Sequence, residues 1–301
     1  MSKKVQVLMR VAFALAIIVI GNYVIVAQTT LTGDWKARLD SDKPNKIYLS
    51  FERRTENGGR NQNGSNYDFK DLQNLSIEQA RGSGAVKFSL VREAGTIECE
   101  GSFSNGKGAG TFLFTSNPQF IQAMKTRGFD FEADSSRRKH HDLEERLFAA
   151  TTLNVTTALA DDLLSADFGK LDTEDLFKAA IFKIDSQFMR EMKASGFPNL
   201  GMEDLVKARI FKIDAAFVKE VVAMGFDKEE FESLVKMRIF KVTPEFIAEA
   251  RSEGLTNLDI EDLVKMRIFK IDAAFIREAK AAGVPLNVEK LVEKRIGVWS
   301  K

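Results

Sequence analysis

The stretch that decides the fold is Leu234–Gly254, LVKMRIFKVTPEFIAEARSEG, because close copies of it recur through the C-terminal part of the chain. The copies begin at Leu176 (LFKAAIFKID), Leu205 (LVKARIFKID), Leu263 (LVKMRIFKID) and Leu291 (LVEKRIGV). Together with Leu234, these leucines are spaced 29, 29, 29 and 28 residues apart. A fixed period between about 20 and 50 residues is typical of a repeat array. The sequence therefore predicts an α-helical repeat array.

Each copy has the pattern of two short helices joined by a turn. In the last full unit, Asp259 can cap a first helix that ends near residues 268–269, and Asp272 can cap a second helix that carries Phe275. Gly283 follows the second helix, where a left-handed C-terminal residue is common. The second cap recurs as Asp185, Asp214, Thr243 and Asp272, and the glycine recurs as Gly196, Gly225, Gly254 and Gly283. We expect helix–turn–helix units throughout.

Weaker copies lie upstream of these units. Thr156 occupies a cap position, and Asn117 precedes a proline in the same way that Thr243 precedes Pro244. Divergent units are typical of the ends of an array. We divide the helical part, residues 116–301, into weak units at 117–146 and 147–175, clear units from residues 176, 205, 234 and 263, and a terminal half-unit from residue 291.

Residues 30–115 have the composition of a small β domain. Segments such as KIYLSFERR, AVKFSLVRE and GTIECEGSF are rich in β-branched and aromatic residues, and NGKG is a strong hairpin signal. The polar run within 52–66 predicts a mobile loop, and DLQNLSIEQARG predicts a turn and one short helix. We predict an antiparallel meander of five or six strands, so the whole chain is expected to have an α+β fold.

The N-terminus has the pattern of a targeting segment. MSKKVQVLMR is basic, residues 5–27 are mostly apolar, and Ala27 offers a cleavage position. Two interpretations stay open for residues 1–27: a secretory signal peptide, or an uncleaved anchor in the inner membrane. Both place the remainder outside the cytoplasm, in the periplasm or the extracellular space, with the basic residues on the inner side.

Composition excludes several functional classes. The 44 basic and 43 acidic residues give a net charge of +1, which lacks the basic footprint of a nucleic-acid-binding protein. Cys99 is the one cysteine, and its alternation with Ile97 and Phe103 predicts a buried thiol. Both histidines lie in RRKHHD, residues 137–142, without further metal-binding residues nearby. We assign no catalytic residue, no cofactor and no metal site, although a carboxylate pair of a hydrolase would be invisible to spacing.

A family resemblance rests on GDWKARL, FSLVREAGTIECEGSFSNGKGAGTFLFTSNPQFIQAM and the RIFKVTPEFI-type repeats. With these motifs the chain resembles bacterial exported proteins, and it is similar to extracytoplasmic regions found behind BlaR1/M56-type sensor peptidases. The resemblance implies an extracytoplasmic sensing or interaction region. The chain has no HExxH motif, so the peptidase activity of those sensors is not expected here, and neither is their acylation activity.

Two sets of charged residues recur with the units and are candidates for a structural ladder. The arginines follow the key leucines by four residues, and the glutamates follow the second-helix phenylalanines by three. We predict pairing of Glu191 with Arg209, Glu220 with Arg238, Glu249 with Arg267, and Glu278 with Arg295. The alternative is a groove in which the arginines bind acidic partners.

A third set, Lys183, Lys212, Lys241 and Lys270, precedes the second-helix caps. Such lysines form a solvated edge or dock an acidic surface.

The sequence thus favours a non-enzymatic protein that binds another protein of the cell envelope through its helical repeats. An alternative is binding of a small ligand or an envelope polymer by the β domain, with the repeats as a docking stalk. Membrane contact is expected only through residues 5–27 if they are uncleaved, and the sequence leaves the oligomeric state open.

Overall fold

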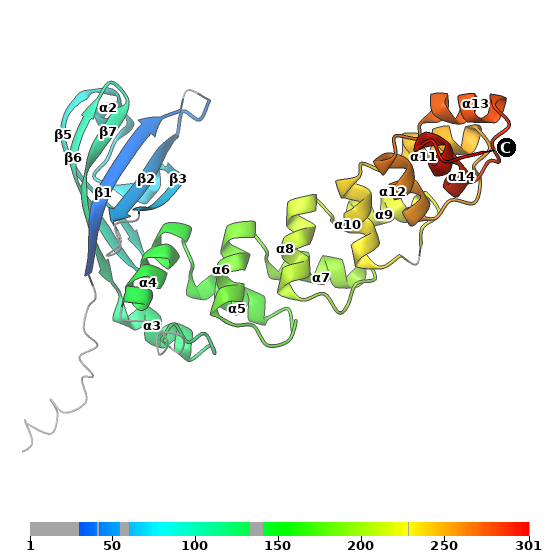
Figure 1. Cartoon of the computed structure of the whole chain (residues 1–301). Helices are drawn as coiled ribbons and strands as arrows, with labels where there is room; N and C mark the ends of the chain where they lie inside the picture. Colours follow the sequence, from blue (N-terminus) through cyan, green and yellow to red (C-terminus); the bar gives the residue numbers. More distant parts are fainter. Residues whose placement is uncertain (1–29, 41, 55–59, 133–140, 228, 301) are drawn as a thin grey trace, which may run out of the picture. The chain divides into compact units, whose positions relative to one another are not determined.

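The structure, a computed structural model, describes residues 30–40, 42–54, 60–132, 141–227 and 229–300. The expected α+β class is confirmed: an N-terminal seven-stranded antiparallel sheet is followed by a series of helices, α3 to α14 (Figure 1). Contacts divide the chain into two compact units. The first contains the sheet, α3 and α4 up to Asn154, and the second contains Arg127–Phe129 and the chain from Val155 onward. Apart from Arg127–Phe129, the two units divide after Asn154.

The sheet is built from β1 (Thr30–Leu39), β2 (Lys46–Arg54), β3 (Arg60–Asp68), β4 (Leu72–Gln73), β5 (Ser83–Arg92), β6 (Gly95–Ser104) and β7 (Lys107–Ser116). Its order is β3-β2-β1-β7-β6-β5-β4, with every neighbouring pair antiparallel. A meander of five or six strands is therefore wrong, because β1 lies in the middle and pairs with β7 as well as β2. The predicted NGKG hairpin is confirmed, with Asn105 and Gly106 at φ 50° and 82°.

Strand β3 corrects the prediction of a mobile loop over 52–66. Its polar residues, RNQNGSNYD, pair with β2 along the whole strand, while residues 55–59 lie outside the described part. As an edge strand, β3 exposes most of its side chains, so the backbone ladder rather than an apolar pattern defines it. Gly64 fits beneath Tyr48: a Cβ atom at Gly64 would lie 2.2 Å from the Tyr48 hydroxyl oxygen.

The core of the first unit is aromatic, and Trp35 lies at its centre. The Trp35 ring is fully buried, contacts the rings of Phe88 and Phe103, and donates from Nε1 to the Glu100 carbonyl at 3.1 Å. The same inward-facing alternation buries Cys99, as predicted, and this burial raises the pKa of its thiol.

Helix α4 (His141–Leu153) covers part of the inner face of the sheet. Its Phe148 ring lies 5.7 Å from that of Phe51 and 5.4 Å from those of Phe112 and Phe114, measured between ring centres. A 2.7 Å ion pair between Arg53 and Glu145 adds a polar tie at the edge of this cluster. This packing explains why α4 belongs to the unit of the sheet although its sequence resembles that of the repeats.

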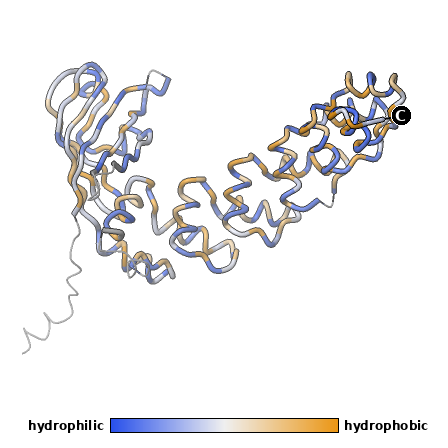
Figure 2. Tube along the Cα trace, viewed as in Figure 1, coloured by the Kyte–Doolittle hydropathy of each residue, from blue (hydrophilic) through white to orange (hydrophobic). Residues whose placement is uncertain are grey.

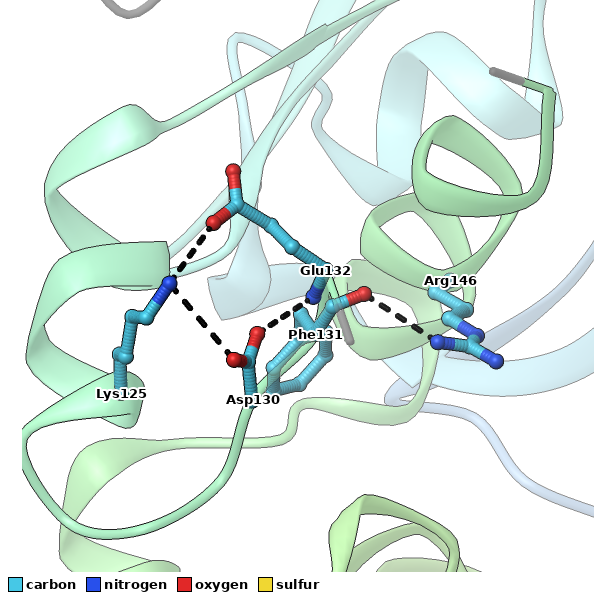
Figure 3. Close-up of polar contacts among 5 residues, drawn as sticks. All are labelled: Lys125, Asp130, Phe131, Glu132 and Arg146. Atoms are coloured by element: carbon cyan, nitrogen blue, oxygen red, sulfur yellow. Dashed lines mark hydrogen bonds and ion pairs between the residues drawn. The ribbon is translucent and has the colours of Figure 1, made fainter. Parts of the chain in front are cut away.

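The segment between α3 (Pro118–Lys125) and α4 is held by polar contacts (Figure 3). Lys125 Nζ lies 3.6 Å from the Asp130 carboxylate and 3.2 Å from that of Glu132. On the other side, Arg146 Nη1 donates to the Phe131 carbonyl at 3.2 Å. One short stretch thus connects the last turn of α3 to α4.

The second unit consists of short helices in succession: α5 (Thr157–Leu164), α6 (Thr173–Phe182), α7 (Ser186–Ala194), α8 (Met202–Phe211), α9 (Ala215–Ala223), α10 (Phe231–Ile239), α11 (Pro244–Ser252), α12 (Ile260–Ile268), α13 (Ala273–Ala281) and α14 (Val288–Arg295). The predicted caps are confirmed, because the side chains of Asp185, Asp214, Thr243 and Asp272 each accept the backbone N–H three residues on. Figure 2 shows that hydrophobic and hydrophilic residues mix within these helices, and the buried residues form one face of each.

No helix in the described ranges is long and apolar enough to cross a membrane. The predicted targeting segment, residues 1–27, lies outside those ranges.

Candidate functional site

The helices α6, α8, α10, α12 and α14 (the first helices) contact one another in sequence order, α6 with α8 through to α12 with α14. A lysine with positive φ follows each of α6, α8, α10 and α12 within two residues, and a second helix (α7, α9, α11 or α13) comes next. The φ values are 54° at Lys183, 56° at Lys212, 54° at Lys241 and 53° at Lys270. This left-handed conformation reverses the chain so that the next residue, such as Ile213, is buried.

The four ladder arginines contact these lysine caps rather than the glutamates. Arg238 Nη2 donates to the Lys212 carbonyl at 3.0 Å, and its guanidinium carbon lies 3.6 Å from the centre of the Phe217 ring. The same contacts recur for Arg209 on Lys183 and Phe188, Arg267 on Lys241 and Phe246, and Arg295 on Lys270 and Phe275. Each arginine therefore binds a backbone carbonyl at the C-terminal end of the preceding first helix.

The predicted glutamate–arginine pairing is thus wrong. Within the described part of the chain, Glu191, Glu220, Glu249 and Glu278 are exposed and form no ion pair with the arginines. Glu191 instead accepts a hydrogen bond from Gln187 on its own helix. The physical reason is that each guanidinium lies over a phenylalanine ring, where a carboxylate would lose its hydration. In Arg209 and Arg267 this leaves the Nε atom buried without a hydrogen-bond partner.

A charge ladder does exist, between other residues. Lysines on one first helix pair with glutamates on the next, in the pairs Lys178–Glu203, Lys207–Glu232, Lys236–Glu261 and Lys265–Glu289. Sequence reasoning missed this ladder, although its signal was present. The lysine follows each key leucine by two residues, and the glutamate precedes the next key leucine by two.

Beside this ladder, each first helix exposes one isoleucine at its C-terminal end. Ile181, Ile210, Ile239 and Ile268, the isoleucine row, have exposed fractions of 52%, 53%, 48% and 51%. Each stands three residues after a ladder lysine, on the solvent side of its helix. Single exposed apolar residues are ordinary, but four at equivalent positions on contacting helices form an organised apolar surface.

The lysine row, Lys183, Lys212, Lys241 and Lys270, lies two residues beyond the isoleucines and is exposed. Among the described residues, these four lysines form no ion pair, in contrast to the lysines of the ladder. Their ammonium groups are therefore available to an anionic partner. The structure places all four predicted lysines on one series of caps, next to apolar residues that the sequence analysis did not single out.

Most of the histidine-containing insertion, RRKHHD, lies outside the described ranges, which omit residues 133–140. In the described ranges, no group of three or more His, Cys, Asp or Glu residues is placed to hold a metal ion.

Comparison of the chain with family models, with curated proteins and with solved structures gives no match. The resemblance to BlaR1/M56-type extracytoplasmic regions therefore stays an expectation from the sequence.

Proposed function

We propose that this chain is an exported, non-enzymatic interaction protein that binds an extended, acidic polypeptide of the cell envelope along its helices. The observation that carries the proposal is the isoleucine row beside the unpaired lysine row. The basic and apolar residues 1–27 support export, because they have the pattern of a signal peptide or an anchor. The family resemblance supports a sensing or interaction role.

In this proposal the second unit is an α-solenoid of 29-residue helix pairs. Support comes from features that recur at equivalent sequence positions: the left-handed lysine, the arginine on the cap carbonyl, and the lysine–glutamate pair between first helices. Repeat proteins stack such units so that each one contacts its neighbours, which creates long surfaces for partners.

The charges determine the chemistry of the partner. Because the glutamates of the exposed face are paired with ladder lysines, the unpaired charge beside the isoleucines is positive. A partner that covers both rows must supply apolar side chains for the isoleucines and carboxylates for the lysines. A polypeptide that combines apolar and acidic residues has this composition.

The spacing determines the conformation of the partner. Packed helices have axes about 8–10 Å apart. A polyproline II segment advances about 9 Å in three residues and presents every third side chain on the same face. One turn of such a segment therefore matches one unit of the array, so we expect an apolar residue at every third position of the partner.

A synthetic peptide tests this directly. A repeat of Leu-Glu-Pro, about fifteen residues long, has the proposed period and conformation, and a scrambled peptide of the same composition is the control. In fluorescence anisotropy, we expect the periodic peptide to bind the full chain at least about tenfold more tightly than the scrambled one. Substitution of the isoleucine row by serine is expected to abolish the difference.

Substitution of the lysine row by glutamine is expected to lower the affinity for the periodic peptide and to make that affinity less dependent on salt concentration. The matched control replaces Lys70, Lys170, Lys193 and Lys219, which are also exposed, so the change in net charge is the same. Equal binding of both peptides would contradict the proposal. So would a dimer in analytical ultracentrifugation that the isoleucine variant disrupts, because the row would then be an interface between two copies of this chain.

A further inference from the structure

A cavity at one end of the sheet, independent of the helical surface, collects positive charge. Its volume is about 580 Å³, within the range of small-molecule sites, and Arg38, Lys107 and Arg81 line it together with Leu39, Pro44 and Ile77. From the sequence, the β domain is an alternative binding site for a small ligand or an envelope polymer. The charges and walls of this cavity define the chemistry of that ligand.

Arg38 and Lys107 face each other on paired strands. They are direct partners in the register of β1 and β7, and like charges in this arrangement destabilise a sheet. Elsewhere in the sheet, lysines stand near glutamates instead: Lys87 lies 2.6 Å from Glu100, and Lys36 lies 3.2 Å from Glu52. The pairing of the end of β1 with the start of β7 is therefore an exception, and a bound anion would relieve the repulsion between its two cations.

Other groups orient these cations without neutralising them. The Arg38 guanidinium lies 4.6 Å from the centre of the Tyr48 ring, on the side of β1 opposite to β7. Arg81 stands on the last turn of α2 (Ile77–Arg81). The pKa of the nearby Glu78 is lowered by hydrogen bonds with its own backbone and with Ser76, and to a smaller extent by the charge of Arg81. In the described ranges, Arg38, Arg81 and Lys107 form no ion pair.

Backbone hydrogen bonds hold the cavity walls in place. The Leu39 N–H donates to the Gly106 carbonyl at 2.8 Å, the Gly106 N–H donates to the Ala80 carbonyl at 3.1 Å, and the Asn105 N–H donates to the Gly82 carbonyl at 3.0 Å. These bonds join β1, the β6–β7 turn and the end of α2. The side chains of the cavity are thus carried by a connected framework, which reduces the entropy lost on binding.

We propose that this cavity binds a small organic anion, with a phosphate or carboxylate group held by Arg38, Lys107 and Arg81 and an apolar part against Leu39, Pro44 and Ile77. Guanidinium groups match the paired oxygens of both anions, and the lysine adds a point charge. Asp40 is the one carboxylate in the lining, and its Oδ1 accepts the Asp42 N–H at 3.0 Å.

Calorimetric titration of the full chain with phenyl phosphate tests the proposal. Sodium chloride is added so that the titrations with all ligands have the same ionic strength. We expect saturable binding of phenyl phosphate, weaker binding of inorganic phosphate, and no binding of benzyl alcohol. The double variant Arg38→Gln/Lys107→Gln and the single variant Arg81→Gln are each expected to weaken binding at least about tenfold. The control Lys36→Gln/Lys87→Gln removes two cations that have glutamate partners and should leave binding unchanged.

A second measurement separates ligand binding from repulsion alone. At low ionic strength, Arg38→Gln/Lys107→Gln should raise the melting temperature, and phenyl phosphate should stabilise the native chain but not this variant. Equal stabilisation by chloride would overturn the proposal. It would also be overturned if phosphatidylglycerol vesicles bound through these residues while phenyl phosphate did not, because the surface would then recognise a membrane.

Discussion

The guanidinium of Arg238 stacks on the ring of Phe217, 3.6 Å from its centre, and donates to the carbonyl of Lys212. A charge-assisted hydrogen bond contributes about 1.5–3 kcal/mol, and an exposed cation–π contact about 0.5–1 kcal/mol. We therefore expect Arg238→Ala to lower the free energy of unfolding by about 2 kcal/mol in urea denaturation. Glu220→Ala, which removes the partner expected from sequence, should leave stability unchanged; an equal loss would restore the glutamate pairing.

The left-handed lysines predict an unusual stabilising substitution. Lys212 has φ 56°, and residues other than glycine lose about 1–2 kcal/mol in this conformation. Lys212→Gly should raise the free energy of unfolding by up to about 1 kcal/mol, after the entropy gained by the unfolded chain is subtracted. Lys212→Ala removes the same charge without relieving the backbone and should not stabilise. Under our proposal, both variants should bind the periodic peptide less tightly.

Asp162 links α5 to the start of α7 and makes stability depend on pH. Its carboxylate accepts the Ser186 N–H at 2.8 Å and the Ser186 hydroxyl at 2.7 Å, and these bonds hold the pKa of Asp162 below its ordinary value. A lowered folded-state pKa contributes stability above the unfolded pKa, and this contribution is lost as pH falls through the folded value. Asp162→Ala should cost about 1 kcal/mol at neutral pH, and the difference should shrink as pH falls below about 4 and through the lowered pKa of folded Asp162. A difference that persists in acid would contradict this assignment.

Two facing glycines let β6 and β7 approach closely beside Trp35, whose Cζ2 would lie 2.8 Å from a Cβ atom on Gly101. Gly101 and Gly110 are partners between β6 and β7, and a Cβ atom on Gly110 would lie 2.0 Å from the Glu100 carbonyl oxygen. Gly110→Ala should therefore lower the free energy of unfolding by about 1–3 kcal/mol through overpacking. Tryptophan fluorescence should show a less cooperative unfolding transition for this variant. Gly128→Ala is a useful comparison, since its Cβ meets no atom within 4 Å and only its φ of 90° is strained.

Helix caps were the most predictable part of this chain. Asp214 and Thr243 are recognisable from sequence, because capping depends on the side chain three residues before a phenylalanine and not on distant contacts. The hairpin at Asn105–Gly106 was predictable for the same local reason. The pairing of β1 with β7 was not, since it joins residues about as far apart in sequence as the β domain allows.

The candidate surface was predictable only in part. The lysine row was found from its spacing, but the isoleucine row was not, because an apolar residue at a recurrent helical position is usually buried. The arginine contacts were misassigned for a different reason. Opposite charges suggest a pair in sequence, whereas Arg238 satisfies its charge with a backbone carbonyl and an aromatic ring, neither of which is visible as a charge pattern.

The bond from each arginine to the preceding cap gives the helical series a direction. Arg295 of α14 completes the end of α12, and Arg267 of α12 completes the end of α10, so each of these two helix ends depends on the first helix that follows it. We therefore expect a mechanical load at the C-terminus to break these arginine hydrogen bonds one after another, beginning with those of Arg295.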